Sequence, residues 1–202
     1  MVARARLVVA ALLVAPLLAG CSGSDDPPAE STARPTPLAK LDVASVRLAR
    51  AEFCDRVPDS AVEAALGGKS EADDGWKNGD PVPGADGESG EVGHEIGCAW
   101  TGAGGAAARA WVFARPVTAD FAGVLVRDAG RQQGCTAEQT PTFGTPAVLQ
   151  TCTLSDGVQR VRRAGLFADT WLTCEVSGAA DPTLARRTDR WCAAVVSALD
   201  AG

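Results

Sequence analysis

The chain has 202 residues, of which 46% are hydrophobic and 22% are charged, enough apolar material to fold one domain or two small ones. This composition excludes collagen-like, coiled-coil and multispan membrane chains. The 25 Asp and Glu residues outnumber the 19 Lys and Arg residues and give a net charge of −6, so nucleic acid is not an expected partner. A single His and the absence of Tyr leave few of the side chains that most catalytic sites use.

The first 20 residues have the pattern of a bacterial secretion signal. Two arginines precede an apolar run over residues 7–18, which is shorter than the roughly 20 residues of a membrane span. The sequence LAGC at residues 18–21 resembles the lipobox of bacterial lipoproteins. This resemblance implies cleavage of a signal peptide, residues 1–20, and attachment of diacylglycerol to the thiol of Cys21. The alternative is an ordinary cleaved signal that leaves Cys21 as a free thiol.

Residues 21–40 combine the expected lipidated Cys21 with a segment that is rich in Ser, Pro and Thr and poor in apolar residues. Such a composition favours a disordered, extended tether. Two acyl chains hold a protein firmly at a membrane, whereas one chain gives marginal binding. We therefore expect a protein that is anchored by lipid at the outer face of the cytoplasmic membrane and does not span it.

Six cysteines remain when Cys21 is set aside: Cys54, Cys98, Cys135, Cys152, Cys174 and Cys192. An even number in an exported chain predicts three disulfides. The spacing contains no C-x-x-C pair, and a single His gives poor support to a Cys/His zinc site. Several pairings are compatible with the spacing, and we predict the sequential one: Cys54–Cys98, Cys135–Cys152 and Cys174–Cys192.

The hydrophobic pattern beyond residue 40 predicts helices and strands that do not alternate. The expected helices are residues 58–66, a segment from Thr118 to Gly134, and a segment after Asp181. The expected strands are residues 98–101, 108–117, 147–154, 158–164 and 170–176. This order is typical of the α+β class. We predict one extracytoplasmic domain over residues 41–202, with a single antiparallel sheet of about five strands, helices packed on one face, and disulfide staples.

Polar residues at two positions predict helix starts. Thr118 is expected to cap a helix whose apolar residues, Phe121 among them, face inward. Asp181, which precedes a proline, is the expected N-cap of the C-terminal helix. Cys192 lies on the apolar stripe of that helix, so it is placed to reach Cys174 on the strand before it.

An acidic, Gly-rich loop is expected at residues 68–95. Its eight carboxylates against Lys69 and Lys77 leave a local charge of −6. The acids do not follow the spacing of a calcium-binding loop, so we expect solvated carboxylates rather than a cation site. Trp76 is the exception, because a large apolar ring in such a loop either tucks back on the core or is offered to a partner. We expect the tucked arrangement and retain Trp76 as a candidate binding residue.

Several features together resemble actinobacterial secreted lipoproteins of unknown function. They are the lipobox, the Ser/Pro/Thr-rich tether, Cys54 before a short helix, the strand Gly97-Cys98-Ala99-Trp100, and the late pair Cys174 and Cys192. The features are more remotely similar to the extracellular sensor domains of mycobacterial receptor Ser/Thr kinases, which are disulfide-bonded α+β modules. The resemblance implies a non-catalytic binding or sensing domain, and it supplies no site residues.

Catalytic motifs are missing from the sequence. It contains no G-x-S-x-G and no P-loop, and its one histidine, His94, lies in the acidic loop. His94 begins an H-E-x-x-H pattern that ends in Cys98, so the second zinc ligand is absent. Paired-carboxylate glycosidase chemistry has no sequence motif to search for, because its two acids need only lie close together in the folded protein. We therefore predict no enzymatic activity, no cofactor and no metal, with an envelope hydrolase as the least favoured alternative.

Two sets of residues are candidates for binding. Arg160 and Arg162 alternate along a predicted strand and share one side of it, with Arg163 on the other, which gives either an anion-contacting strip or an ordinary solvated sheet face. Four tryptophans, Trp100, Trp111, Trp171 and Trp191, either pack in the core or line a pocket for a lipid or cell-wall fragment. Core packing is the plainer interpretation of these four rings.

The sequence as a whole predicts a membrane-anchored lipoprotein with a non-catalytic, sensor-like extracytoplasmic domain. Its partner beyond the membrane is an unknown small molecule or an envelope protein. The alternative is a structural or interaction subunit of a cell-envelope complex.

Overall fold

The computed structural model describes residues 35–80, 93–154 and 157–201. The predicted signal peptide, Cys21 and most of the tether lie outside these residues, as does the segment 81–92 of the acidic loop. Residues Arg34–Gly202 form a compact unit. Within the described ranges, every helix is too short or too polar to span a membrane.

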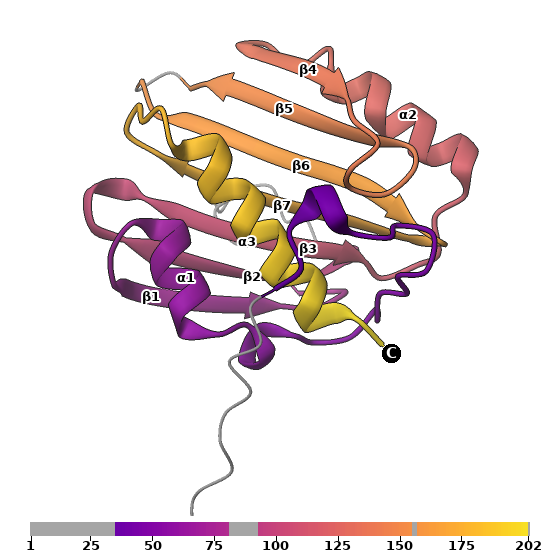
Figure 1. The fold of residues 1–202 in the computed structure, drawn as a ribbon, viewed down its shortest axis with the longest axis horizontal. Helices are drawn as coiled ribbons and strands as arrows, with labels where there is room; N and C mark the ends of the chain where they lie inside the picture. Colours follow the sequence, from indigo (N-terminus) through magenta and orange to yellow (C-terminus); the bar gives the residue numbers. More distant parts are fainter. Residues whose placement is uncertain (1–34, 81–92, 155–156, 202) are drawn as a thin grey trace, which may run out of the picture. The chain divides into compact units, whose positions relative to one another are not determined.

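One antiparallel sheet forms the centre of the described residues and contains seven strands there (Figure 1). The strands are β1 (Ser70–Trp76), β2 (Glu95–Gly102), β3 (Ala107–Phe113), β4 (Cys135–Gln139), β5 (Ala147–Thr153), β6 (Gln159–Phe167) and β7 (Thr170–Gly178). Their spatial order is β1-β2-β3-β7-β6-β5-β4. Two meanders of consecutive strands are therefore joined where β3 pairs with β7.

The α+β class and the single antiparallel sheet are confirmed, but the predicted number of about five strands is wrong. The two additional strands are β1, which lies inside the expected acidic loop 68–95, and β4. Six of the seven residues of β1 are exposed, and no residue of β4 is fully buried. Because these strands at the two ends of the sheet are held by backbone pairing, they lack the apolar alternation by which strands are recognised in a sequence.

Three α-helices pack on the sheet in the described part of the chain: α1 (Asp59–Leu66), α2 (Ala119–Ala129) and α3 (Leu184–Leu199). In Figure 1, α1 and α3 lie across the front of the sheet. They bury the larger core, which includes Phe53, Leu172 and Trp191. This side of the sheet is termed the α3 face.

The helix α2 lies on the other side of the sheet, termed the α2 face. Its residues Ala122 and Val126 pack with Ala164 and Trp171. Trp171 is the strand neighbour of Leu172, which belongs to the larger core, and successive residues of a strand point to opposite faces. The prediction that all helices pack on one face is therefore wrong, because the sheet presents apolar residues on both faces.

The boundaries of α2 agree with the sequence at its start and differ at its end. The hydroxyl oxygen of Thr118 accepts a hydrogen bond from the backbone N–H of Phe121 at 3.3 Å, as expected for a cap. The helix ends at Ala129, earlier than the predicted Gly134, whose φ of +75° lies in the turn before β4. The Phe121 side chain is exposed rather than inward-facing, because Ala122 supplies the buried contact.

The folded residues begin before the predicted boundary at residue 41. Leu38 lies in a short 3₁₀ turn, Leu38–Lys40, and is buried in the larger core. Further along this N-terminal segment, Arg50 donates a hydrogen bond to the Asp169 carboxylate at 2.8 Å. The end of the predicted tether is thus part of the folded domain.

Asp181 stabilises the turn that leads into α3 rather than serving as its N-cap. The helix has Thr183 at its N-cap, and the Asp181 carboxylate accepts hydrogen bonds from the Thr183 backbone N–H at 2.8 Å and from its hydroxyl at 2.6 Å. Arg187 of α3 lies 3.1 Å from the same carboxylate and donates to the backbone carbonyl of Ala65 in α1. These contacts join the start of α3 to α1.

Acid is expected to weaken the domain through two of these carboxylates. Hydrogen bonds from Thr183 lower the pKa of Asp181 from its ordinary value of 3.8, and the hydrogen bond from Arg50 lowers the pKa of Asp169 likewise. A carboxylate whose folded pKa is depressed contributes stability above its unfolded pKa and loses it as the pH falls through the folded pKa. The loss should therefore begin below about pH 4.

Urea unfolding at pH 7, pH 4 and pH 3 tests this expectation. Asp169→Asn and Asp181→Asn should each reduce the difference in stability between pH 7 and pH 3, because the titrating group is gone. Glu138→Gln, which removes an exposed carboxylate from β4, is the control. An acid dependence that is the same in all four proteins would contradict the assignment.

Disulfides join three pairs among the described residues. The pairs are Cys54–Cys98, Cys135–Cys152 and Cys174–Cys192, with Cα–Cα distances of 5.6, 4.0 and 5.7 Å. These are the sequential pairs that we predicted among the pairings that the spacing allows. The first holds the segment before α1 against β2, the second joins the paired strands β4 and β5, and the third holds α3 against β7.

Gly165 of β6 lies where another backbone segment crosses the sheet. A Cβ atom at this position would overlap the carbonyl oxygen of Phe143, and Phe143 is itself fully buried against Phe167. We expect Gly165→Ala to lower the free energy of unfolding by about 3 kcal/mol, because a backbone atom must move to make room. Gly68→Ala is the matched control, since a Cβ there meets nothing within 4 Å. Equal urea midpoints for the two variants would contradict this prediction.

Candidate functional site

A row of polar side chains crosses the α2 face of the sheet. The strand register places Gln150 of β5 beside Arg162 of β6, Arg162 beside Glu175 of β7, and Glu175 beside Arg109 of β3. Arg160 lies two residues before Arg162 and therefore on the same face. These five residues are termed the arginine row.

Glu175 is the acceptor at the centre of the arginine row. Its side chain is 6% exposed, and its Oε2 atom accepts a hydrogen bond from Nε of Arg162 at 2.7 Å, with Nη2 of Arg162 also at 2.7 Å. Nε of Arg160 lies 3.7 Å from the same oxygen. A buried carboxylate requires such partners, because an unpaired charge in the protein interior is costly.

The arginine row holds more positive charge than Glu175 neutralises. It contains three guanidinium groups and one carboxylate, in a chain whose net charge is −6. Burial, together with the charges of Arg162 and Arg109, lowers the pKa of Arg160, and Glu175 opposes this effect. Nε of Arg109 is buried and has no hydrogen-bond partner among the described residues. A surplus of partly buried guanidinium groups is suited to binding an anion.

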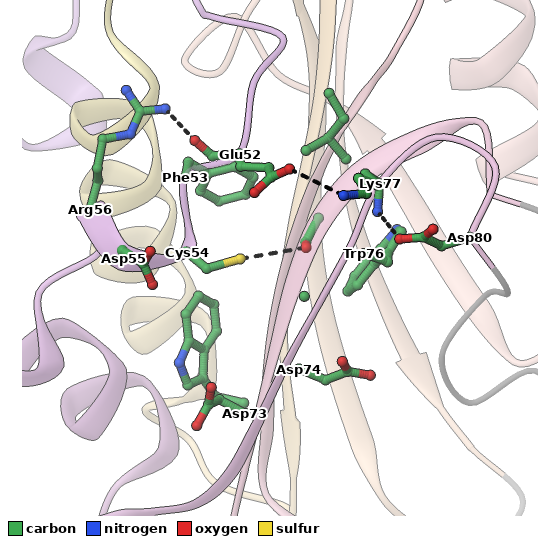
Figure 2. A pocket seen from close by; sticks show the side chains of 14 residues that line it. Glu52, Phe53, Cys54, Asp55, Arg56, Asp73, Asp74, Trp76, Lys77 and Asp80 are labelled. Atoms are coloured by element: carbon green, nitrogen blue, oxygen red, sulfur yellow. Dashed lines mark hydrogen bonds and ion pairs between the residues drawn. The ribbon is translucent and has the colours of Figure 1, made fainter.

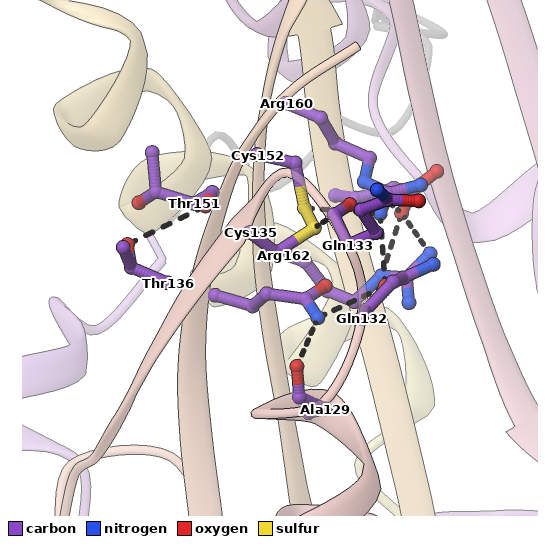
Figure 3. Close-up of a disulfide and its surroundings, with 11 residues drawn as sticks. Ala129, Gln132, Gln133, Cys135, Thr136, Thr151, Cys152, Arg160 and Arg162 are labelled. Carbon is purple, nitrogen blue, oxygen red and sulfur yellow. Dashed lines mark hydrogen bonds and ion pairs between the residues drawn. A yellow bond between two sulfur atoms is a disulfide. The ribbon is translucent and has the colours of Figure 1, made fainter.

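Gln132 and the Cys135–Cys152 disulfide flank one end of the row (Figure 3). Oε1 of Gln132 accepts hydrogen bonds from Nε2 of Gln150 at 2.9 Å and from Nη2 of Arg160 at 3.3 Å. The same Nη2 lies 3.2 Å from Sγ of Cys152. Nε2 of Gln150 also donates to the carbonyl of the last residue of α2 at 2.8 Å. These contacts fix Gln150 and the outer part of Arg160.

A groove of about 520 Å³ lies beside the arginine row, between α2 and the sheet. Its apolar lining consists of Trp111, Phe113, Leu125, Ala129, Val148, Ala164 and Trp171, and its polar lining of Glu95, Asp128, Arg131, Gln132, Arg162 and Thr173. Arg162 belongs to both the row and the groove, and its guanidinium carbon lies 5.3 Å from the centroid of the Trp111 ring. The volume is within the range of small-molecule sites, about 300–1,000 Å³.

A second hollow, of about 410 Å³, lies along β1 (Figure 2). Five carboxylates line it: Glu52, Asp55, Asp73, Asp74 and Asp80. Arg56 and Lys77 also line it, and Nζ of Lys77, which is largely exposed, is 3.9 Å from the Glu52 carboxylate. The described residues contain no group of three His, Cys, Asp or Glu side chains placed to hold a metal ion. Glu52, Asp55, Asp73 and Asp74 are exposed, so these acids form a solvated surface.

Trp76, which lines this second hollow, is tucked against the sheet as the sequence predicted. Its side chain is buried, and its ring occupies the space that a Cβ atom at Gly97 of β2 would need. The indole N–H has no hydrogen-bond partner among the described residues. Trp76 therefore packs on the sheet and does not extend toward a partner.

The predicted arginines lie as strand alternation requires. Arg160 and Arg162 share the α2 face, while Arg163 lies on the α3 face, where its Nε donates to the Asp189 carboxylate of α3 at 2.6 Å. The strand face that carries Arg160 and Arg162 is neither a bare anion site nor an ordinary solvated face, because Glu175 already pairs with both arginines. His94 is exposed, as expected.

The four candidate tryptophans divide between the two faces. Trp100 and Trp191 pack edge to face in the larger core, with ring centroids 5.3 Å apart. Trp111 and Trp171 line the groove on the α2 face. The expectation of core packing thus holds for Trp100, Trp191 and Trp171, which is 3% exposed and packs in the smaller core. Trp111 and Trp171 also border the groove, as the pocket alternative had it.

The sequence did not single out Arg109 and Glu175. Arg109 alternates with Trp111 in a predicted strand, so their common face was available from the pattern. Glu175 lies in another predicted strand, about 65 residues later. That these two strands are neighbours follows from the strand order and register, and no local signal carries that information.

The fold and this face together define a disulfide-bonded α+β domain with a candidate anion-binding site. No protein family and no curated protein matches the chain. Among solved structures, the extracellular domain of PknH from Mycobacterium tuberculosis is similar at 15% sequence identity and a TM-score of 0.41. The match covers 69% of this chain and 91% of that one.

Proposed function

We propose that this chain is a lipid-anchored protein of the cell envelope whose folded domain binds a ligand without catalysing a reaction. The observation that carries the proposal is the groove on the α2 face and the arginine row that adjoins it. A groove with a largely apolar wall and a few convergent polar groups is the usual form of a small-molecule site. The disulfides support an extracytoplasmic location, because such bonds persist in oxidising compartments.

The chemistry of the arginine row favours binding over catalysis. Its guanidinium groups present N–H donors in a rigid fork that matches a carboxylate or a phosphate. Glu175 accepts a hydrogen bond from Arg162 and is thus already engaged within the row. These features support the binding of an anion.

The anchor is assigned to Cys21, on the lipobox resemblance of the sequence. Expression of the full chain in a lipoprotein-processing host with radiolabelled fatty acid tests it. We expect label on the mature protein, recovery in the membrane fraction, and an N-terminus at Cys21. Cys21→Ser should lose the label and release the protein from the membrane. Membrane association of the unlabelled Cys21→Ser protein would contradict the assignment.

Binding is tested by mass spectrometry of the domain Arg34–Gly202, which is a compact unit with its own core, secreted from an oxidising host. Denatured protein should weigh about 6 Da less than the reduced chain, because three disulfides remove six hydrogens. Native protein should carry additional mass that denaturation removes. If the native mass equals the denatured mass and organic anions leave the Tm unchanged, the binding function is rejected, and an interaction subunit of an envelope complex becomes the better hypothesis.

A further inference from the structure

We propose that the ligand of this site is a small amphiphilic anion. Its phosphate or carboxylate head contacts Arg109 and Arg160, and its apolar body lies in the groove under α2. This inference rests on the proposed function and names the chemical class of ligand for the same site.

The head position follows from which guanidinium groups are already engaged. Arg162 is committed to Glu175 and to the Trp111 ring. Arg160 uses Nη2 on Gln132, and its Nε, which lies 3.7 Å from Oε2 of Glu175, is buried without a hydrogen bond. Nε of Arg109 is likewise buried and has no hydrogen-bond partner among the described residues. Arg109 is thus the least engaged guanidinium group of the arginine row, and Arg160 is held less closely by Glu175, at 3.7 Å, than Arg162 is, at 2.7 Å.

Arg109 and Arg160 are close enough to share one anion. They lie on β3 and β6, the two neighbours of β7, so their strands are about 10 Å apart. Arg109 is paired with Glu175 and Arg160 with Ser177, two residues further along β7. Two long side chains across this spacing can converge on a phosphate or carboxylate, which accepts several charge-assisted hydrogen bonds.

The body position follows from the groove. Trp111 lies two residues after Arg109 on the same face of β3, about 7 Å along the strand, and its ring forms the groove wall. The apolar part of the remaining wall includes Phe113, Leu125 and Trp171, and its polar part includes Arg131 and Arg162 together with the carboxylates of Glu95 and Asp128. A simple anion would leave this apolar wall in water, and an uncharged apolar molecule would leave Arg109 without a counterion. A molecule with both parts satisfies both surfaces.

The stability of an Arg109 variant separates a binding role from a structural one. Because Arg109 has no counterion of its own and repels Arg160, Arg109→Gln should leave the Tm unchanged or raise it. Residues kept for binding often show this pattern, in which their removal stabilises the protein and weakens binding.

Titration calorimetry on the domain Arg34–Gly202 tests the ligand class with four probes below their micelle concentrations. The probes are decyl phosphate, decanoate, inorganic phosphate and the uncharged decyl maltoside. We expect decyl phosphate or decanoate to bind at least about tenfold more tightly than inorganic phosphate or decyl maltoside. A hydrogen bond to a charged group and a buried alkyl chain each raise the affinity by about tenfold or more. The better of the two charged probes identifies the head as phosphate or carboxylate.

Three variants locate the two parts of the ligand. Arg109→Gln should weaken binding of the charged probe about tenfold or more, without a lower Tm. Leu125→Gln on α2 should weaken the decyl probes and leave inorganic phosphate unaffected. Arg186→Gln removes the same charge from an exposed position on α3, at the other face, and should change neither.

Each outcome separates this inference from the proposed function. Equal affinities for decyl phosphate and decyl maltoside, with no effect of Arg109→Gln, would overturn the anionic head and leave a groove that binds an uncharged ligand. Equal affinities for decyl phosphate and inorganic phosphate would overturn the apolar body and leave a simple anion site. Failure of all four probes overturns the ligand class; the native mass then decides whether the binding function also falls.

Discussion

Glu175→Gln is expected to lower the free energy of unfolding by about 3–5 kcal/mol, the usual effect of removing one partner of a buried ion pair. The Glu175 side chain is 6% exposed and is the only carboxylate of the arginine row. Its replacement leaves three guanidinium groups on the α2 face without a counterion. The loss of stability follows from the loss of charge and not from a change of volume, since Gln and Glu have nearly the same shape. Urea unfolding of the domain at pH 7 measures the loss.

Two further variants show whether the loss comes from unbalanced charge. Glu63→Gln makes the same chemical change at an exposed position of α1 and should alter stability by less than about 0.5 kcal/mol. The double variant Arg109→Gln/Glu175→Gln should recover part of the loss, because one of the unpaired cations is removed with the carboxylate. If the single and double variants are equally destabilised, Arg109 does not contribute to the charge balance around Glu175.

Replacing Cys54 and Cys98 together with Ala is expected to cost about 4 kcal/mol of stability, more than loss of the Cys135–Cys152 pair at about 3 kcal/mol. The first disulfide closes 44 residues and the second closes 17. A longer closed loop removes more conformational freedom from the unfolded chain. Cys98 is also fully buried in the larger core, so the loss of packing acts in the same direction. Urea unfolding of the two double variants shows which of them loses more stability.

Loss of the Cys135–Cys152 pair provides an internal comparison. That disulfide joins strands that are already paired by backbone hydrogen bonds, so the native alignment of β4 and β5 should survive without it. A greater loss of stability from this pair than from Cys54 and Cys98 would contradict the loop-length argument. It would indicate that β4 depends on its disulfide for pairing.

The parts of the fold that the sequence predicts are those with a local signal. The strands β5, β6 and β7 have apolar alternation, α2 has Thr118 at its N-cap, and an even number of cysteines in an exported chain predicts disulfides. The strand β1 has no such signal, because its sequence SEADDGW contains one large apolar side chain. The face on which α2 packs was also not predictable, since the chain carries apolar residues for both faces of the sheet.

The candidate site illustrates the same division between local and long-range information. The shared side of Arg160 and Arg162 follows from the two-residue period of a strand, and the structure has them so. The partnership of Arg162 with Glu175 depends on the register of β6 against β7, and that of Arg109 on the pairing of β3 with β7. Register and strand order are set by the packing of the whole core, so the sequence of a single segment does not predict them.

The exposed carboxylates of β1 have a consequence for how copies of this domain meet. Glu71, Asp73 and Asp74 lie on the strand at one end of the sheet order, and an end strand presents backbone groups to which the sheet of another molecule can add. Charges of one sign along such a strand oppose this edge-to-edge joining, because the second copy brings the same charges. The acidic segment therefore works against edge-to-edge association of two copies.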